Sequence, residues 1–333
     1  MMANPISTSI DFERDGLQHG FLQIPHSRND SAWGSIMLPI SYAKNGDGAG
    51  AILTGANHGD EYEGPIALQQ LANSIDVDQV SGRVIIIPMM NYPAFQAATR
   101  VSPIDQLNMN RIFPGDACGS VTRLIADYIT RSLLPMCDYV LDIHSGGKTL
   151  EFLPFAAYHE LEDKTQQAAC EAATRAFAAP YFLSLIEIDA GGMYDTQAEA
   201  MGKVFVSTEL GGGGTTTPQT AEIAKRGVHN FLVHAGILDA SPRAADRPAV
   251  KLDMQQDNAY LFSLHNGLLE SCVSLGDAVQ CGDLIARVYS CERTGEDPVE
   301  YHAKSDGIIV GRHYPSLIKI GDFMNVIARV VQE

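Results

Sequence analysis

A short turn between an apolar run and a helical pattern holds residue types that could bind a metal ion. The stretch GANHGDEYEGP places His58 and Glu61 three residues apart, directly after AILTGA. An imidazole nitrogen and a carboxylate oxygen at this spacing can face one point in space, and Zn²⁺ accepts both ligand types. Carboxylates at a helix start also stabilise its positive end. The turn by itself therefore leaves metal binding and helix stabilisation both open.

Two further strand ends carry side chains of the same kinds. YVLDIHSGG places Asp142 and His144 at the end of one predicted strand, and KVFVSTELGGGG places Glu209 at the end of another. In open α/β sheets, ligands bind outside the carboxyl ends of the strands. These three residues and His58 therefore fall where such a site forms.

Together these residues predict a catalytic zinc site with one Zn²⁺ per chain. His58, Glu61 and His144 supply the three protein ligands of such a site, which keeps its fourth position open. Asp142 lies two residues before His144, a strand spacing that points both side chains the same way and suits a carboxylate that orients a ligand histidine. Glu209 is then a spare carboxylate, the group that takes a proton from a water activated by the metal.

The segment 91–116 (NYPAFQAATRVSPIDQLNMNRIFPGD) is long, polar and irregular, and it follows another predicted strand. Arg100, Asn108, Asn110 and Arg111 stand out in a chain that is poor in arginine. A guanidinium can bind a carboxylate through two hydrogen bonds, and an asparagine amide adds a donor. The segment therefore predicts a substrate carboxylate site, with ordinary surface charges as the alternative.

The elements that must position these residues alternate between strand and helix patterns from about residue 36 to 238, which predicts an α/β domain with helices on both faces of a mixed sheet. The predicted strands are SIMLPISYA, AILTGA, RVIIIPMMN, YVLDI, EFLPFAAY and KVFVSTEL. The predicted helices are PIALQQLANSI, SVTRLIADYITRSLL, DKTQQAACEAATRAFAA and PQTAEIAKRGVHNFLVHAGI.

Composition predicts how this domain is flanked. Residues 1–35 are expected to be an irregular lead-in or a hairpin, residues 36–240 the catalytic domain, 241–252 a linker rich in Pro and Ala, and 253–333 a C-terminal β module. Within that module, GLLESCVSLGDAVQCGDLIARV is echoed by GIIVGRHYPSLIKIGDFMNVIARV, which predicts an internal repeat of short strands. The module resembles the lipoyl/biotinyl barrel-sandwich fold and is expected to be structural or to form a rim around the site.

Charge and composition limit the classes of partner that the chain is expected to bind. With a net charge of −17 and no run of basic residues, the 333-residue chain is not expected to bind nucleic acid or anionic membranes. Six scattered cysteines without a CxxC pair, and an N-terminus without an apolar signal core, favour a reduced cytoplasmic protein. A homo-oligomer is compatible with this composition.

The motifs GANHGDEYEG, NMNRIFPG, LDIHSGG and TELGGG occur in this order. Together they resemble the succinylglutamate desuccinylase/aspartoacylase family, over roughly residues 35–240. The resemblance implies a three-layer αβα fold of the zinc carboxypeptidase type. The N-terminal half looks like the subgroup that deacetylates N-acetyl-L-2,4-diaminobutyrate in ectoine breakdown.

The resemblance also implies residue roles and an activity. It implies zinc ligands at His58, Glu61 and His144, and a general base and acid at Glu209. Arg100 would polarise the scissile carbonyl, and Asn110 with Arg111 would bind the substrate carboxylate. The implied function is zinc-dependent hydrolysis of an N-acyl amino acid, a small molecule, most simply by removal of an acetyl group.

Several alternatives remain at this point. The substrate could instead be N-succinylglutamate or N-acetylaspartate, the enzyme could be a metallocarboxypeptidase, or the fold could bind metal without catalysis. A serine hydrolase is disfavoured, because Ser145 and His144 are adjacent on a strand and point to opposite faces. The run Gly211–Gly214 is explained equally well by a loop that gates the substrate or by a tight connection.

Overall fold

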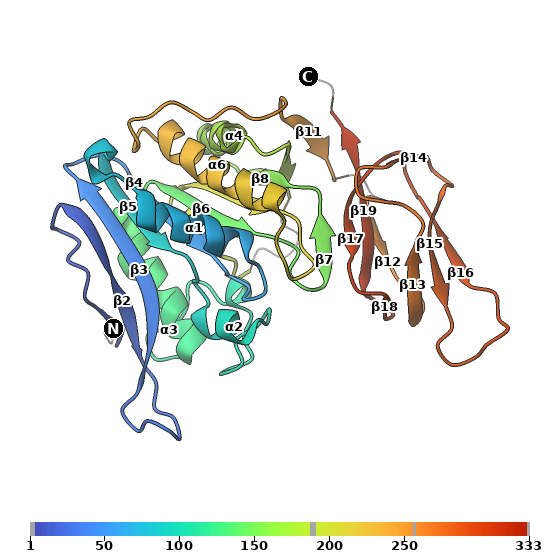
Figure 1. Ribbon diagram of the computed structural model, residues 1–333, viewed down its shortest axis with the longest axis horizontal. Helices are drawn as coiled ribbons and strands as arrows, with labels where there is room; N and C mark the ends of the chain where they lie inside the picture. Colours follow the sequence, from blue (N-terminus) through green and yellow to red (C-terminus); the bar gives the residue numbers. More distant parts are fainter. Residues whose placement is uncertain (1–3, 187–190, 256–257, 332–333) are drawn as a thin grey trace.

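A mixed β-sheet forms the centre of the molecule, which is a computed structural model describing residues 4–186, 191–255 and 258–331 (Figure 1). Four central strands run parallel and place their carboxyl ends at one edge, whereas the N-terminal strands add in antiparallel fashion. In spatial order the strands are β1 (Ser7–Thr8), β2 (Gly16–Pro25), β3 (Ser35–Asn45), β5 (Gly82–Ile87), β4 (Gly50–Gly55), β6 (Tyr139–His144), β10 (Val204–Glu209), β8 (Phe155–His159), β9 (Tyr181–Leu185) and β11 (Val250–Asp253).

Helices cover both faces of this sheet, so the predicted three-layer αβα arrangement is confirmed. Side chains from α1 (Glu63–Ser74), α4 (Lys164–Phe177) and α6 (Pro218–His234) share one hydrophobic core with the sheet. Side chains from α3 (Val121–Tyr128) and α5 (Tyr194–Ala200) belong to the core on the other face. Figure 1 shows α1, α4 and α6 side by side over the sheet.

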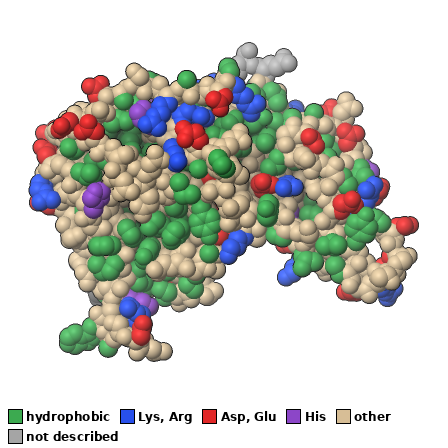
Figure 2. All heavy atoms as spheres, in the orientation of Figure 1, with side chains coloured by type: hydrophobic (Ala, Val, Ile, Leu, Met, Phe, Trp, Pro, Cys, Tyr) green, Lys and Arg blue, Asp and Glu red, His purple; other side chains and the backbone are tan. Residues whose placement is uncertain are grey.

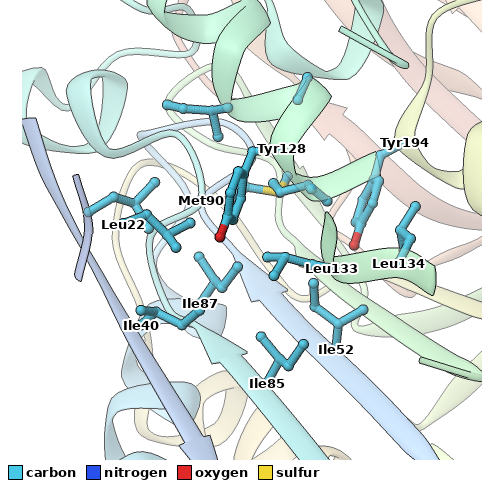
Figure 3. Close-up of a cluster of buried hydrophobic side chains, with 14 of the residues drawn as sticks. Leu22, Ile40, Ile52, Ile85, Ile87, Met90, Tyr128, Leu133, Leu134 and Tyr194 are labelled. Atoms are coloured by element: carbon cyan, nitrogen blue, oxygen red, sulfur yellow. The ribbon is translucent and has the colours of Figure 1, made fainter. Parts of the chain in front are cut away.

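The two cores explain why the central strands read as continuous apolar runs. Ile52 and Ile85 belong to the core that contains α3, whereas their neighbours Leu53 and Ile86 belong to the core that contains α1. Successive strand residues point to opposite faces, and both faces here are covered, so most positions in the middle of these strands are apolar. Figure 3 shows Ile52 and Ile85 packed among side chains such as Leu133.

The N-terminal prediction is partly wrong. Residues 16–25 are not an irregular lead-in but the long strand β2, which pairs with β3 from Gly16 to Pro25 and extends the sheet. The hairpin alternative describes this region correctly. The pattern is weak because β2 alternates buried and exposed residues at the edge of the sheet, so fewer of its positions are apolar.

Three other predicted boundaries also differ. EFLPFAAY forms two strands, β7 (Leu150–Phe152) and β8, because Pro154 between them has no N–H for a sheet ladder. The predicted linker 241–252 ends in a strand, since β11 begins at Val250 and pairs with β9. The segment 91–116 is not wholly irregular, because it contains α2 (Tyr92–Ala97) and a 3₁₀ turn at Met109–Arg111.

Every regular element that the structure describes after residue 257 is a strand, as predicted for a β module. They are β12 (Tyr260–Phe262), β13 (Gly267–Ser271), β14 (Ala278–Val279), β15 (Leu284–Tyr289), β16 (Val299–His302), β17 (Gly307–His313), β18 (Leu317–Ile318) and β19 (Phe323–Val330). The sequence repeat has a structural counterpart: β14 of the first copy pairs with β17 of the second, and β18 of the second pairs with β13 of the first. The barrel-sandwich classification and the domain limits stay predictions.

Strand pairing joins the C-terminal strands to the catalytic part at two places. β11 lies between β9 and β19, so one sheet continues from the catalytic strands into the C-terminal ones. β17 also pairs with β7, and the guanidinium of Arg312 contacts the Glu151 carboxylate through two nitrogens at 2.7 and 2.6 Å. Figure 1 shows the C-terminal strands at one end of the molecule, beside β7. These contacts place C-terminal residues next to the site.

On the face drawn in Figure 2, Lys and Arg side chains lie among Asp and Glu side chains rather than in a separate basic area. Across the residues that the structure describes, no helix combines the length and apolar character needed to cross a membrane.

We expect Gly227→Ala to destabilise the fold. A Cβ at Gly227 in α6 would lie 2.2 Å from the ring of Phe177, which is fully buried in α4. Overpacking of this kind costs about 1–3 kcal/mol, which outweighs the gain of about 1 kcal/mol from replacing a helical glycine. Chemical denaturation should show the loss, and the Phe177→Leu background should reduce it. Unchanged or increased stability in Gly227→Ala would contradict this packing.

Candidate active site

The ends of neighbouring parallel strands bring the predicted ligand residues together. His58 and Glu61 lie in the turn after β4, and His144 is the last residue of β6, which pairs with β4. One ligand atom from each of the three residues lies within 4.8 Å of the others. All three side chains are buried. The structure therefore contains the three-residue cluster that the sequence predicted, and this cluster could hold a metal ion.

The carboxylate of Glu61 lies between the two imidazoles. Its Oε1 is 2.8 Å from His58 Nδ1, and its Oε2 is 3.0 Å from His144 Nδ1. Burial alone would raise the pKa of Glu61, but the two imidazoles hold it below its ordinary value. A glutamate in this environment is an anion whose two oxygens both face nitrogen atoms.

The far nitrogen of His144 has a partner that sets the orientation of the ring. His144 Nε2 lies 2.8 Å from Asp142 Oδ2. Asp142 is itself held by the Thr54 hydroxyl at 2.7 Å and by the Asn57 amide at 2.9 Å. The Nε2–H of His144 is thus directed at a carboxylate, and Nδ1 is directed at Glu61. The predicted contact between Asp142 and His144 is present, whereas the two supporting residues were not predicted.

His58 is oriented by a residue to which the sequence analysis assigned no such contact. Its Nε2 lies 3.2 Å from Asn108 Oδ1, which also accepts the Asn110 N–H at 2.9 Å. Because this oxygen can only accept, Nε2 of His58 carries a proton. Burial lowers the pKa of His58 and so favours the neutral ring, in which Nδ1 presents its lone pair to Glu61. Only the folded structure reveals this contact, because residues 58 and 108 are far apart in the chain.

A close approach to α2 restricts the backbone of the turn after β4. A Cβ at Gly59 would lie 2.0 Å from the Ala94 carbonyl carbon in α2, so only glycine fits. Asp60 and Glu63 do not reach the ligand cluster through hydrogen bonds. Asp60 accepts the Lys148 N–H at 2.8 Å, and Glu63 accepts the Thr220 hydroxyl at 3.0 Å. Asp60 therefore connects the turn to the loop at Lys148, and Glu63 connects it to the start of α6.

Glu209 pairs in register with His144, because β10 lies directly beside β6. Its Oε2 is buried and has no hydrogen-bond partner among the described residues. Burial raises the pKa of Glu209 to about 8, and the negative charge of Glu61 contributes to this rise. A carboxyl with such a pKa can both take up and release a proton near neutral pH.

A cavity of about 250 Å³ lies over this cluster. His58, His144 and Glu209 line it together with Arg100, Asn110 and Arg111, so the structure brings every predicted binding and catalytic residue to one place. Arg100 Nη1 lies 3.7 Å from Glu61 Oε1. Phe152 and Phe155 line the same cavity, and Met254, Tyr260 and Val326 contribute to its wall. Tyr260 and Val326 belong to β12 and β19, which agrees with a C-terminal module that forms a rim.

Two ionisable side chains in this cavity were missed. Asp195, at the start of α5, and His159, at the end of β8, both line it and are both buried. His159 Nδ1 contacts Glu199 Oε1 at 2.9 Å. His159 directly follows the predicted strand EFLPFAAY, so a strand-end signal could have marked it, whereas no motif marks Asp195.

The glycine run after Glu209 is a tight connection. Gly211 through Gly214 all have positive φ, a region that favours glycine. The Gly211 carbonyl accepts the N–H groups of Gly146 and Phe152, both at 3.0 Å. A Cβ at Gly213 would lie 2.6 Å from the ring of Tyr314 in the C-terminal part. The two explanations for the glycine run were a gating loop and a tight connection. These contacts support the tight connection.

Comparisons with known proteins agree with the motifs. The succinylglutamate desuccinylase/aspartoacylase catalytic domain matches residues 47–235. The chain is 52% identical over 329 residues to the N-alpha-acetyl-L-2,4-diaminobutyric acid deacetylase of Halomonas elongata, covering 99% of this chain and 96% of that one.

Solved structures of similar proteins share the whole fold. The product-bound ectoine utilization protein EutE (DoeB) from Ruegeria pomeroyi is 54% identical, with a TM-score of 0.95 over 98% of this chain and 100% of that one. A succinylglutamate desuccinylase from Silicibacter sp. TM1040 is 56% identical, with a TM-score of 0.96 over 99% of this chain and 100% of that one. A succinylglutamate desuccinylase/aspartoacylase from Rhodobacter sphaeroides is 35% identical, with a TM-score of 0.93 over 98% of this chain and 99% of that one.

These matches confirm the predicted enzyme class, which is a hydrolase of linear amide bonds. They do not favour the two alternatives, a metallocarboxypeptidase and a metal-binding protein without catalysis. The four motifs occur in order, and the matches extend over most of the chain. The chain therefore belongs to the succinylglutamate desuccinylase/aspartoacylase family.

Proposed function

We propose that the protein is a zinc-dependent deacetylase that hydrolyses N-acetyl-L-2,4-diaminobutyrate. The observation that carries the reaction type is the cluster of His58, Glu61 and His144 beside Glu209, whose Oε2 is buried without a hydrogen-bond partner in the described chain. The substrate follows the name of the Halomonas elongata deacetylase, which is similar over nearly the full length of both chains.

The donor set fits a zinc ion. His58 directs a lone pair at Glu61 from 2.8 Å, and two acceptors at that distance repel each other unless a positive charge lies between them. Burial lowers the pKa of His58, which disfavours a proton in that position. Two imidazole nitrogens and one carboxylate oxygen are typical zinc ligands, whereas Mg²⁺ and Ca²⁺ prefer sites made of oxygen alone.

The ion would be held by His58, Glu61 and His144 and, when bound, would act as a Lewis acid toward the acetyl carbonyl and the attacking water. Glu209 would take a proton from that water as its oxygen bonds to the acyl carbon. Glu209 would then deliver the proton to the nitrogen atom as the C–N bond breaks, which yields acetate and the free amine. Burial favours the protonated form of Glu209 and so helps it to hold the proton until the amine receives it.

Three other residues would orient the substrate and stabilise charge. Arg100 would face the oxygen that becomes negative during the attack. Asn110 and Arg111 would bind the α-carboxylate and so fix the amide in place. The Asn110 side-chain oxygen already accepts the Tyr194 N–H at 2.9 Å, so its amide N–H₂ group is the part left to donate to a substrate.

We expect Glu209→Gln to lose at least about 100-fold in turnover while its zinc content stays unchanged, because glutamine cannot take up a proton. Steady-state kinetics and elemental analysis measure the two quantities. Glu63→Gln is a matched control, since it removes a nearby carboxylate but keeps an oxygen that can accept from Thr220. Near-native activity in Glu209→Gln would remove this residue from the mechanism.

We expect His144→Ala to abolish stable zinc binding, because it removes one of three ligands. Asn108→Ala keeps all ligands but frees the His58 ring, so its zinc affinity should fall by about 10- to 100-fold. Competition with a chelator measures both effects. His159→Gln is the control, since this buried histidine lines the same cavity outside the ligand cluster. Full zinc occupancy in His144→Ala would contradict its assignment.

We expect Arg111→Ala to weaken the use of N-acyl amino acids with a free carboxylate by about 10- to 100-fold in kcat/KM, the value of a charge-assisted hydrogen bond. The corresponding carboxylate esters should be affected much less. Comparing each acid with its ester in both proteins tests the assignment. Equal losses on the acid and the ester would show that Arg111 does not bind the carboxylate.

A further inference from the structure

One wall of the cavity is apolar, and the catalytic sheet and the C-terminal strands build it together. Phe155, Met254 and Val326 line the cavity and belong to one buried hydrophobic cluster, against which Phe152 packs. The rings of Phe152 and Phe155 lie 5.9 Å apart, edge to face. Phe155 belongs to β8 and Val326 to β19, so strands that are far apart in the sequence form one surface. The proposed reaction assigns no role to this apolar wall.

The apolar wall begins next to the proposed base. Glu209 pairs in register with His144 on β6 and, on its other side, with Phe155 on β8. The base therefore lies between the strand of a metal ligand and the apolar wall. The acyl carbon must lie beside Glu209 when the activated water attacks it, and the rest of the acyl group is bonded to that carbon. The acyl group is thus a part of the substrate that this geometry brings to the wall.

A glycine in the C-terminal part makes room for two side chains of this wall. Gly311 in β17 pairs in register with Phe152 on one side and with Val326 on the other. A Cβ at Gly311 would lie 2.6 Å from the Phe152 ring and 2.9 Å from a methyl carbon of Val326. Any larger residue there would force one of the two side chains to move. The apolar wall is therefore closely packed, and C-terminal residues help to set its shape.

Among the residues that the structure describes, this wall carries no Lys or Arg side chain that could bind an anion. The two guanidinium groups that line the cavity are those of Arg100 and Arg111, and both belong to the segment 91–116. His159, on β8, contacts the Glu199 carboxylate at 2.9 Å. Burying a charged group against apolar side chains without a partner costs free energy. The wall is therefore suited to an uncharged part of a substrate.

The proposed substrate has one end without charge. In N-acetyl-2,4-diaminobutyrate the α-carboxylate is an anion and the γ-nitrogen is an ammonium group, whereas the acetyl group ends in a methyl group. An N-succinyl group would extend from the same carbonyl by two methylene groups and would end in a carboxylate. The methyl group matches the apolar wall, and the succinyl carboxylate would be buried there without a partner.

We propose that Phe152, Phe155, Met254 and Val326 form the acyl pocket, which accepts an acetyl group and excludes longer acyl groups, including those that end in a carboxylate. This inference rests on the proposed function and adds the residues that select the acyl group. Because Val326 comes from β19, the C-terminal part takes part in substrate selection. The alternative role of these four side chains is structural, as packing between the sheet and the C-terminal part.

Three α-N-acyl derivatives of 2,4-diaminobutyrate test the pocket in the wild-type enzyme. The kcat/KM for the acetyl derivative should exceed that for the butyryl and the succinyl derivatives by at least about 100-fold, because one methylene in an apolar pocket changes kcat/KM by about 10- to 200-fold and an unpartnered carboxylate costs more. Values within about threefold of one another on all three derivatives would overturn the acyl pocket and leave the deacylase activity intact.

Met254→Ala enlarges the pocket and should reduce the preference for acetyl over butyryl by at least about tenfold. Val326→Ala enlarges the same pocket from β19 and should act in the same direction. The preference is a ratio of two kcat/KM values on one preparation, so a lower fraction of folded enzyme does not change it.

Leu252→Ala is the matched control. Leu252 belongs to the same buried cluster but is not among the residues that line the cavity, so its loss should leave the preference unchanged. An unchanged preference in Met254→Ala and Val326→Ala, or an equal change in Leu252→Ala, would overturn the acyl pocket. A wild-type enzyme that hydrolyses N-succinylglutamate but none of the three diaminobutyrate derivatives would overturn the proposed function and the acyl pocket with it.

Discussion

The Glu61 carboxylate contacts His58 at 2.8 Å and His144 at 3.0 Å, and this pair of contacts joins the turn after β4 to the end of β6. It exists because β4 and β6 are adjacent parallel strands, whose carboxyl ends reach the same edge of the sheet. The buried negative charge of Glu61 also influences its neighbours. It contributes to the raised pKa of Glu209 and, together with Asp142, to the raised pKa of His144.

Hydrogen bonds from neighbouring side chains fix the orientation of both histidine rings. Thr54 and Asn57 hold Asp142, and Asp142 holds His144. Asn108 holds His58 in the same way. Such support fixes the ring orientation and therefore the geometry of a bound ion. Sites with this support lose little entropy on binding, since the ligand side chains are already ordered.

Residues from distant parts of the chain close the cavity over this centre. Tyr260 and Val326 come from the C-terminal strands, and the close packing of Tyr314 against Gly213 links those strands to the loop that follows Glu209. The C-terminal part therefore shapes the site as well as extending the sheet. Protein walls of low polarity strengthen the electrostatic interactions in the cavity, including the one proposed for Arg100.

The sequence by itself determined the central strands, the helices on both faces and the residues at the strand ends. These features have local causes: continuous apolar runs arise from strands covered on both sides, and His58, His144 and Glu209 directly follow such runs. The edge strand β2 and the split at Pro154 were not recognised, because an edge strand has a weaker apolar pattern and proline acts on pairing that only the fold reveals.

Only the tertiary structure decided that Asn108 orients His58 and that Asp195 lines the same cavity as Arg111. Both depend on contacts between segments that are far apart in the chain. Spacing along the sequence carries no information about such contacts, because they arise from how strands pair and loops pack.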